Sequence, residues 1–313
     1  LEEKDFRKSY LLVKNGTPIA RLSLDSSTGG KQLIRKLTED QFDMAFGGVP
    51  SMISYIDQGK YIKILAPVMT EGSGLVLGKN NPVNSWEEFK NYVRNSNTPI
   101  RIGYKIDVSV QNLIFESALK ESGIIFTKNL DDKNAQITLI NLNGAKNLIP
   151  ALENEIIDGF VVNQPFPALA EYQEKGKLIA DLSDLPPAGK WKNNPCCALA
   201  ARTEFSSLYP EITTSFVSLM LRANNFINEN PELVAQQISK WLDLPVEVEK
   251  KSLPTINFIT EFDADWDRGV EFWIKEMIDS NKIRGKVKSS YESGRLAEEL
   301  YLMDTYHQAR KNL

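Results

Sequence analysis

Short apolar runs alternate with helical patterns over the first part of the chain. Residues 19–24 alternate apolar and polar positions with a period of two, as a half-buried strand does. Apolar positions then recur at helical spacing over 33–37. Further apolar runs indicate strands at 42–46, 61–67 and 75–77. Strands that alternate with helices predict βαβ units built on a mainly parallel sheet.

A second series of the same kind begins near residue 99 and runs to about residue 190. Its apolar runs predict strands at 101–104, 137–142 and 160–162, with helical patterns between them. Pro186-Pro187-Ala188-Gly189 is a strong loop signal, and a buried strand is expected at 196–201. Beyond residue 204 the pattern is largely helical. The chain therefore divides into two α/β parts, with a helical continuation.

Composition narrows the function classes. A length of 313 residues is typical of about two domains, and 42% hydrophobic with 25% charged residues is ordinary globular composition. A formal net charge of -4 argues against nucleic acid as a partner, because phosphate contacts need a clustered excess of Lys and Arg. One histidine, His307, and two adjacent cysteines argue against a zinc site and a disulfide framework. No metal or other cofactor is expected.

Small and polar residues gather where predicted strands end. Three such turns lie in the first part, at 26–30, 47–51 and 70–74, and the second part offers 107–109 and 163–167. In open parallel sheets ligands bind at the carboxyl ends of the strands, where helix N-termini suit anionic groups. A single turn of this kind is explained as well by ordinary capping, but several together favour a binding cleft. None is a P-loop or a dinucleotide fingerprint, so a nucleotide is not indicated.

The two cysteines and the acidic cluster each have a simpler structural explanation. Cys196 and Cys197 lie in an apolar strand, where cysteine is usually a small inert hydrophobe. His307 fits a solvated helix surface. Asp263, Asp265 and Asp267 lack the glycine and the terminal glutamate of a calcium loop, and fit the negative first turn of a helix.

Several segments resemble a known family. Residues 31–51, KQLIRKLTEDQFDMAFGGVPS, are similar to the strand–helix–strand signature of type II periplasmic solute-binding proteins. The nearest branch is the one for nitrate, sulfonate, taurine, bicarbonate and thiamine-pyrimidine precursors. Four later segments agree with it in order and spacing, and the resemblance covers nearly the whole chain: 102–124, 158–177, 194–202 and 274–287.

The resemblance implies a two-lobed α/β fold, each lobe a mainly parallel sheet flanked by helices, with ligand between the lobes. Lobe 1 would combine residues 1–95 with 196–313, and lobe 2 would be the inserted residues 96–195. The crossing segments would lie near 78–98 and 190–200. The family's usual first strand and pocket loop have no counterpart before residue 19, so we expect a first sheet strand and part of the ligand shell to be missing.

The function implied is capture of a small anionic or polar organic ligand for an ABC importer, by hinge closure. The partners would be the solute and an ABC permease, and the location periplasmic or cell-surface, with a possible lipid anchor. Ser27, Thr28 and Ser109 would donate hydrogen bonds, Gly48 would permit close approach, and Gln164 would fix orientation. The predicted ligand-binding residues are Ser27, Thr28, Gly48, Ser73, Ser109, Gln164 and Asn194.

Alternatives stay open. The same fold hosts thiamine-pyrimidine synthases and desulfinases, so an enzyme that uses Cys196 or Cys197 is a rival hypothesis, although no catalytic residue is predicted. A sensor or scaffold domain is another. Ser109 could be a plain helix N-cap. Whether Arg101 or Lys105 faces a cleft cannot be read from strand alternation.

Overall fold

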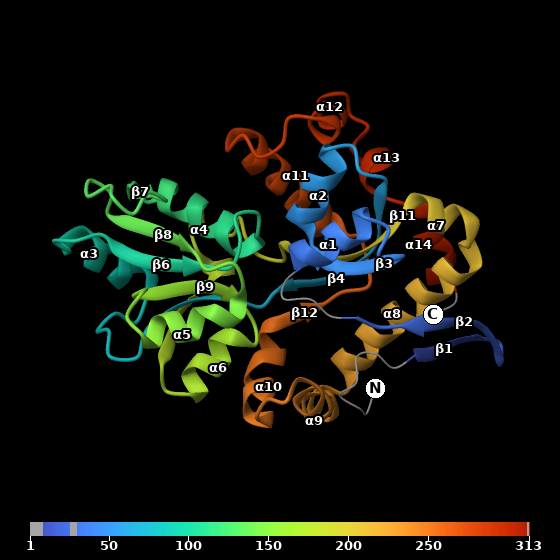
Figure 1. Ribbon diagram of the computed structural model, residues 1–313, viewed down its shortest axis with the longest axis horizontal. Helices are drawn as coiled ribbons and strands as arrows, with labels where there is room; N and C mark the ends of the chain where they lie inside the picture. Colours follow the sequence, from blue (N-terminus) through green and yellow to red (C-terminus); the bar gives the residue numbers. More distant parts are fainter. Residues whose placement is uncertain (1–8, 26–29, 312) are drawn as a thin grey trace. The chain divides into compact units, whose positions relative to one another are not determined.

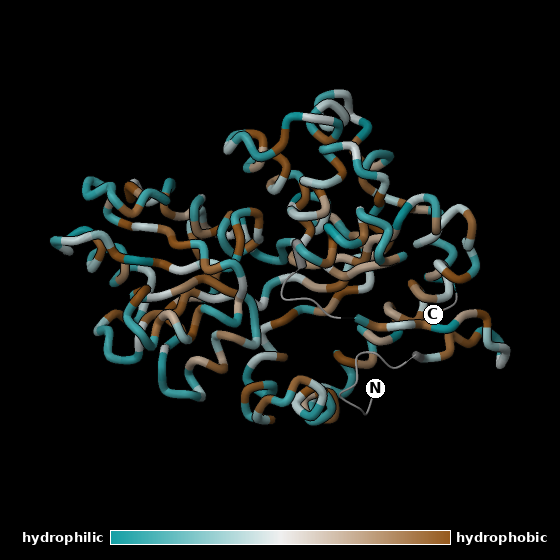
Figure 2. Tube along the Cα trace, viewed as in Figure 1, coloured by the Kyte–Doolittle hydropathy of each residue, from teal (hydrophilic) through white to brown (hydrophobic). Residues whose placement is uncertain are grey.

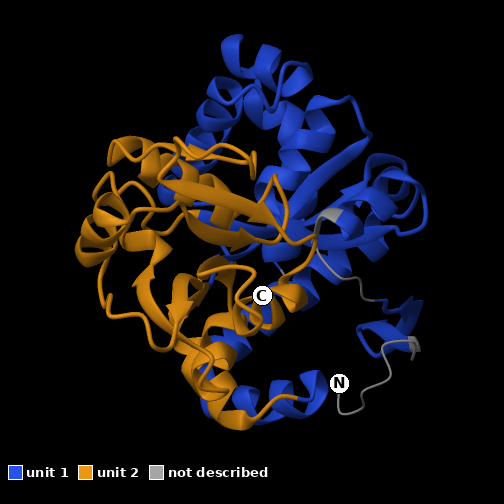
Figure 3. Cartoon of the chain, turned by 60° about the vertical axis from the view of Figure 1, so that its left-hand side comes forward, with its two compact units in different colours: residues 1–70, 195–243, 258–313 blue, residues 71–194, 244–257 orange. Residues whose placement is uncertain are grey.

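The computed structural model describes residues 9–25, 30–311 and 313, and they form two compact units (Figure 3). The first unit comprises residues 1–70, 195–243 and 258–313, and the second comprises 71–194 and 244–257. The chain therefore passes from one unit to the other at four points. Among the described residues no helix is long and apolar enough to cross a bilayer.

The first unit contains one four-stranded sheet, a two-stranded hairpin and most of the helices (Figure 1). Its elements are β1 (Ser9–Lys14), β2 (Thr17–Ser23), α1 (Gly30–Thr38), β3 (Met44–Gly48), α2 (Val49–Asp57), β4 (Ile62–Glu71), β11 (Pro195–Arg202), α7 (Thr203–Leu208), α8 (Pro210–Glu229), α9 (Pro231–Leu242), β12 (Ile256–Phe258), α11 (Ala264–Asp279), α12 (Lys286–Glu292), α13 (Leu296–Leu300) and α14 (Met303–Arg310). The last residue of β4 and the first two of β12 belong to the second unit.

The four-stranded sheet has the order β12-β4-β11-β3. Strand β11 is antiparallel to both of its neighbours, with Ala200 opposite Ala45 of β3 and opposite Ile64 of β4. The expectation of a mainly parallel sheet in this lobe was therefore wrong. The reason is topological: β11 returns to the first unit after the long inserted segment and enters between two strands that run the other way.

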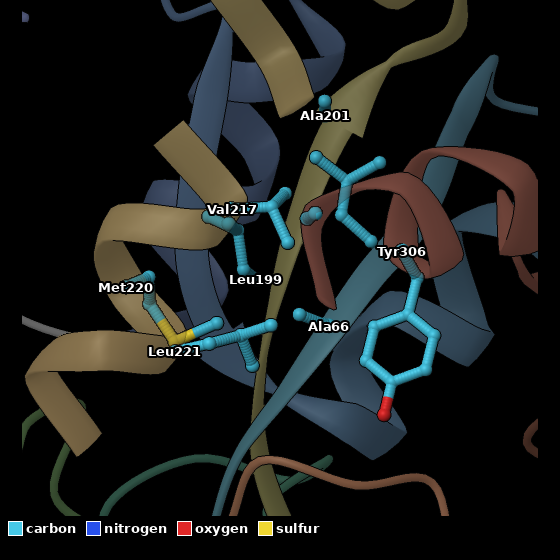
Figure 4. Close-up of a cluster of buried hydrophobic side chains, with 9 residues drawn as sticks. Ala66, Leu199, Ala201, Val217, Met220, Leu221 and Tyr306 are labelled. Atoms are coloured by element: carbon cyan, nitrogen blue, oxygen red, sulfur yellow. The ribbon is translucent and has the colours of Figure 1, made fainter. Parts of the chain in front are cut away.

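Helices α8 and α14 close one face of this sheet around a hydrophobic cluster. Figure 4 shows Val217, Met220 and Leu221 of α8 and Tyr306 of α14 against Leu199 of β11. All five side chains are at most 6% exposed. Burying aliphatic side chains of this size contributes about 1.5–3 kcal/mol each, so this cluster is a main source of the first unit's stability.

The second unit is a six-stranded sheet between helices. Its elements are β5 (Ser73–Gly78), α3 (Trp86–Asn95), β6 (Ile100–Tyr104), α4 (Val110–Glu121), β7 (Phe126–Thr127), β8 (Ile137–Asn141), the 3-10 turn η1 (Ala145–Asn147), α5 (Leu148–Glu153), β9 (Gly159–Asn163), α6 (Phe166–Tyr172), β10 (Gly176–Asp181), η2 (Leu182–Asp184), α10 (Val246–Ser252) and η3 (Leu253–Thr255). The strand order is β10-β5-β9-β6-β8-β7. Strands β9, β6, β8 and β7 are parallel, and β5 and β10 extend one edge of the sheet through two antiparallel pairings, so the sheet is mainly parallel as predicted.

Helices cover the two faces of this sheet. Helices α5 and α6 pack on one face through a cluster that includes Leu148, Phe160 and Ala170, and α4 lies on the other face (Figure 1). Trp86 and Phe89 of α3 meet Phe115 of α4 with ring centroids 6.2 and 6.3 Å apart. In Figure 2 the strands of this sheet are coloured mostly hydrophobic, and the loops at the left-hand end of the unit are coloured hydrophilic.

The expected lobes differ from the two units at residues 71–95, 195 and 244–257. Residues 71–95 belong to the second unit because β5 pairs with β9 and β10, which both lie in that unit. The chain leaves the first unit at 70/71, ahead of the crossing segment expected at 78–98. The second expected crossing, near 190–200, coincides with the boundary at 194/195.

The segment before residue 19 contains a strand that the pattern did not predict. Strands β1 and β2 form an antiparallel hairpin whose two-residue loop is Asn15-Gly16, with φ of 49° and 78°. Positive φ at both loop positions is the type I′ geometry for which Asn-Gly is the preferred sequence. The hairpin forms a sheet of its own and does not extend the four-stranded sheet.

Candidate functional site

A cavity of about 270 Å³ lies at one edge of the second unit's sheet, and the described residues on its wall all belong to that unit. The pairing of the strands explains its position. Ser73 starts β5 opposite Asn163 at the end of β9, and Asp181 ends β10 opposite Gly74. These positions lie at the carboxyl end of the parallel strands, where α/β proteins bind ligands. The wall of this strand-edge cavity is formed by Glu71, Gly72, Ser73, Val110, Ile114, Asp181, Leu182, Ser183, Trp191, Asn194, Pro254 and Thr255.

The N-terminal end of α4 forms part of the wall through Val110 and Ile114. The predicted helix start at 107–109 is confirmed: Ser109 is the N-cap, and its Oγ accepts a hydrogen bond from the Asn112 N–H at 3.3 Å. A helix start presents backbone N–H groups and a partial positive charge. Beside it, Gln111 Nε2 donates to Ser73 Oγ at 2.8 Å, and both side chains are buried. The strand and the helix are thereby fixed to each other at the cavity.

Asn194 supplies the most distinctive polar group on the wall. Its side chain is 3% exposed, and its Nδ2 finds no hydrogen-bond acceptor among the described residues. An unsatisfied buried donor costs about 1–3 kcal/mol, so such a group in a cavity wall points to an acceptor supplied by a ligand. Its place in the wall is well fixed, because the neighbouring Asn193 N–H donates to Glu71 Oε1 at 2.9 Å and Trp191 Nε1 donates to the Pro186 carbonyl at 3.0 Å.

Gly72 could not be replaced without disturbing the wall. Its φ is +65°, and an added Cβ would lie 2.6 Å from Ile256 Cγ1. Its carbonyl accepts from the Gln164 N–H at 2.8 Å. Both constraints fix the turn that aims Glu71 and Ser73 at the cavity.

The charged groups of the wall are acidic. Loss of hydration raises the pKa of the Asp181 carboxyl, and repulsion from Asp184 and Glu71 raises it further, against the attraction of Lys192. Lys192 itself is engaged by Asp184 at 2.6 Å. None of the described wall residues is a Lys, Arg or His.

The structure places the predicted binding residues in different parts of the chain. Ser73 and Asn194 lie on the wall of the strand-edge cavity. Ser109 caps the helix whose first residue lines it. Gln164 is not a wall residue: its Oε1 accepts from the Ala168 N–H and from Ser252 Oγ, each at 3.3 Å, and its backbone supports Gly72. As ligand-binding residues all four stay predictions.

The remaining predicted residues belong to the first unit. Gly48 ends β3 and precedes α2, opposite Cys197 of β11, and a Cβ there would come no nearer than 3.8 Å to the Cys196 carbonyl oxygen. Close approach of a ligand at Gly48 therefore stays a prediction. Ser27 and Thr28 lie outside the described residues.

Sequence reasoning missed Glu71, Asp181 and Trp191. Glu71 stands inside the predicted turn at 70–74, so its place could have been noticed. Asp181 and Trp191 carry no local signal, because they reach the cavity only through the antiparallel pairing of β10 with β5 and the loop that follows.

The two basic residues left open in the sequence have structural partners. Arg101 forms a two-pronged interaction with Asp158, with Nη2–Oδ1 at 2.6 Å and Nε–Oδ2 at 3.1 Å, and this carboxylate raises the pKa of the guanidinium. Lys105 donates to Asn163 Oδ1 at the end of β9. Neither lines the cavity.

The features that would support a metal site or a cysteine enzyme are weak. Cys196 is buried and Cys197 partly buried, and they form no disulfide, with their sulfur atoms 3.8 Å apart. His307 is exposed on α14, and Asp263 caps α11 by accepting from the Trp266 N–H. In the part of the chain that the structure describes, no three His, Cys, Asp or Glu side chains are grouped as metal ligands.

Curated relatives match part of the chain. The bicarbonate transport ATP-binding protein CmpC of Synechococcus elongatus is 25% identical over 232 residues, which are 71% of this chain and 33% of that protein. The nitrate import ATP-binding protein NrtC of Synechocystis is 28% identical over 193 residues, 61% of this chain and 26% of that protein. The chain thus spans about a third or less of the length of these relatives.

Solved structures match over most of the chain. The ligand-binding component of an ABC-type import system from Staphylococcus aureus has a TM-score of 0.73 at 18% identity, covering 98% of this chain and 92% of its own. The periplasmic nitrate-binding protein NrtA of Synechocystis has 0.71 at 15% identity, covering 92% and 79%. The aliphatic sulphonate-binding protein SsuA of Escherichia coli has 0.65 at 13%, covering 87% and 80%. These likenesses confirm the predicted fold class, the type II periplasmic-binding-protein fold.

The family assignment rests on the sequence itself. The profile of the NMT1-like family matches residues 2–243, more than three quarters of the chain, and this stretch includes all of the predicted binding residues. The match extends from the first unit through almost all of the inserted second unit. The chain belongs to the NMT1-like family.

Proposed function

We propose that this chain is the extracytoplasmic solute-binding component of an ABC importer. The observation that carries the proposal is the strand-edge cavity, which joins the start of α4, a buried and unsatisfied Asn194 amide, and the Ser73 and Ser183 hydroxyls at the carboxyl edge of a parallel sheet. Such an arrangement suits reversible capture, because it offers directional hydrogen bonds around a small concave volume. The names of the relatives and of the similar structures support the same function.

The proposed partners are a small polar solute and the permease of the importer. Binding, with no chemical step, is the activity we assign, in keeping with the nitrate-binding and sulphonate-binding proteins among the similar structures. Closure of the two lobes about a hinge stays a prediction of the family resemblance. A lipid anchor likewise stays a prediction.

The first test is a thermal-shift screen of the purified chain against inorganic anions, sulfonates, amino acids, pyrimidines and flavin-like compounds. A ligand at 100 times its Kd adds about 2.7 kcal/mol to the stability of the folded state, which gives a measurable rise in Tm. A shift confined to one chemical class supports solute capture. The absence of a shift with every class would contradict it.

A cavity-filling variant shows whether the binding uses the strand-edge cavity. Val110 is 5% exposed on the wall, and Val110→Phe adds a ring at the cavity. We expect the ligand-induced shift to be lost while the variant still unfolds cooperatively. Ile156→Phe is the matched control, because Ile156 is 52% exposed in the same unit and away from the wall. An unchanged ligand shift in Val110→Phe would remove this cavity from the proposal.

A further inference from the structure

The charges of the strand-edge cavity restrict the kind of solute it can take. Its wall includes two carboxylates, Glu71 and Asp181, and no described wall residue carries a positive charge. Asp184 adds a third negative charge nearby, and Lys192, an opposing charge that acts on Asp181, is paired with Asp184 at 2.6 Å. The cationic Arg101 is bound by Asp158 and is not on the wall.

The start of α4 does not offset these carboxylates. A helix N-terminus is equivalent to about half a positive elementary charge, whereas each ionised carboxylate is a full negative one. A simple anion in this cavity would therefore face repulsion that the helix only partly cancels. Loss of hydration is the larger cause of the raised pKa of Asp181, and repulsion from Asp184 and Glu71 adds to it, so a further negative charge is disfavoured here.

Donors and carboxylates also come from different elements of the wall. Asn194 and the start of α4 supply donors, so they suit an acceptor group. Asp181 ends β10 and Glu71 precedes β5, so the two carboxylates come from neighbouring strands at the sheet edge. Apolar wall comes from Ile114 and Leu182. A cavity of about 270 Å³ is larger than a triatomic or four-atom anion fills.

We propose that the strand-edge cavity takes a zwitterion: a solute whose protonated amine is bound by Glu71 and Asp181 and whose carboxylate or sulfonate is bound by Asn194 and the start of α4. The inference rests on the proposed function, and it narrows the solute class. It disfavours small inorganic anions and organic anions that lack an amine.

Matched pairs of ligands test the proposal directly. Each pair has the same chain and the same oxyanion, and differs only in an amine or a hydroxyl at the other end. We would compare 2-aminoethanesulfonate with 2-hydroxyethanesulfonate, and 5-aminopentanoate with 5-hydroxypentanoate, by isothermal titration calorimetry, with nitrate beside them. At least one amine-bearing compound should bind 10- to 100-fold more tightly than its hydroxyl partner, the range for a charged hydrogen bond.

Variants of the two wall carboxylates test whether they bind the amine of the solute. Asp181→Asn should weaken the amine-bearing compound by about 10-fold or more and leave its hydroxyl partner nearly unchanged. Asp181 is exposed at the end of its strand, so the variant is expected to fold, and Glu71→Gln gives a second test of the same prediction. Asp131→Asn is the control, because Asp131 is an exposed carboxylate of the same unit that is not on the wall.

The outcomes distinguish a failure of the zwitterion inference from a failure of the proposed solute capture. If nitrate or a hydroxyl compound binds as tightly as every amine-bearing partner, the zwitterion inference is wrong and solute capture stands. If Asp131→Asn weakens amine binding as much as Asp181→Asn, the assignment of the carboxylates is wrong. If no compound of this set or of the wider screen binds, both the inference and the proposed function fail.

Discussion

Replacing Asn194 with leucine should make the unliganded protein more stable and should weaken its binding of ligand. The Asn194 side chain is 3% exposed, and its Nδ2 is buried without an acceptor in the described residues. Leucine has a similar length and no polar atom, so the variant removes a cost of about 1–3 kcal/mol for an unsatisfied buried group. It also replaces the amide oxygen and nitrogen with two methyl groups beside the cavity, which adds buried apolar surface. We expect a net gain of about 1–2 kcal/mol.

The assay is thermal and urea unfolding of the unliganded protein, followed by titration with the ligand found in the screen. A gain of 1 kcal/mol corresponds to a rise in Tm of about 2–4 °C for a protein of this size. Asn224 is the matched control: it is also 3% exposed, but its Nδ2 donates to the Val68 carbonyl at 2.9 Å and the Ile259 carbonyl at 2.7 Å. Asn224→Leu should therefore destabilise the protein by about 2–4 kcal/mol. If Asn194→Leu destabilises it as much, the amide is satisfied in solution and the argument for a ligand acceptor there fails.

Three further predictions concern stability. Asp57→Ala should cost about 3 kcal/mol in urea unfolding, because the 7% exposed carboxylate accepts from four backbone N–H groups before and in α12, at 2.8–3.2 Å; a loss below about 1 kcal/mol would contradict this. Gly72→Ala should lower Tm more than Gly123→Ala, since both have φ +65° but only Gly72 has a neighbour, Ile256, in the way; equal losses would mean that the wall adjusts freely. Burial raises the pKa of Glu249, so folding favours its protonated form and the stability of the protein falls as pH rises through the folded pKa. In urea unfolding, Glu249→Gln should therefore be more stable than wild type at pH 7 but not near pH 4. A stability difference that does not change with pH would refute this.

Elements with a local signature were predictable from the sequence. The Ser85 cap illustrates this: its Oγ accepts from the Glu88 N–H at 3.2 Å, as the capping-box spacing predicts. The Glu88 carboxylate accepts from the Asn84 N–H instead of the N–H of Ser85 itself. The Asn15-Gly16 hairpin has an equally local signature, and it was missed because no strand was expected before residue 19. Local chemistry thus determines helix starts and tight turns.

Strand direction and strand neighbours were not predictable in the same way. Period-two alternation shows that a strand is half buried, but not which strand lies beside it or in which direction. The antiparallel entry of β11 between β3 and β4 depends on where the chain returns after the inserted unit, which no local pattern records. The same limit applies to the unit boundary at 70/71, which follows from the partners of β5.

The candidate site shows the consequence of this limit for function. Ser73 and Asn194 could be proposed because small polar residues at strand ends have a general meaning in α/β folds. The negative charge of the site could not be predicted. Asp181 joins the wall only through the pairing of β10 with β5, and Glu71 joins it only through the left-handed turn at φ 60° that precedes β5. A family resemblance carries over the position of a binding edge, since the topology is shared. It does not carry over the charge of that edge, which a few residues at the ends of antiparallel strands can reverse. The solute class is therefore better argued from the wall residues of this chain than from the ligands of similar proteins.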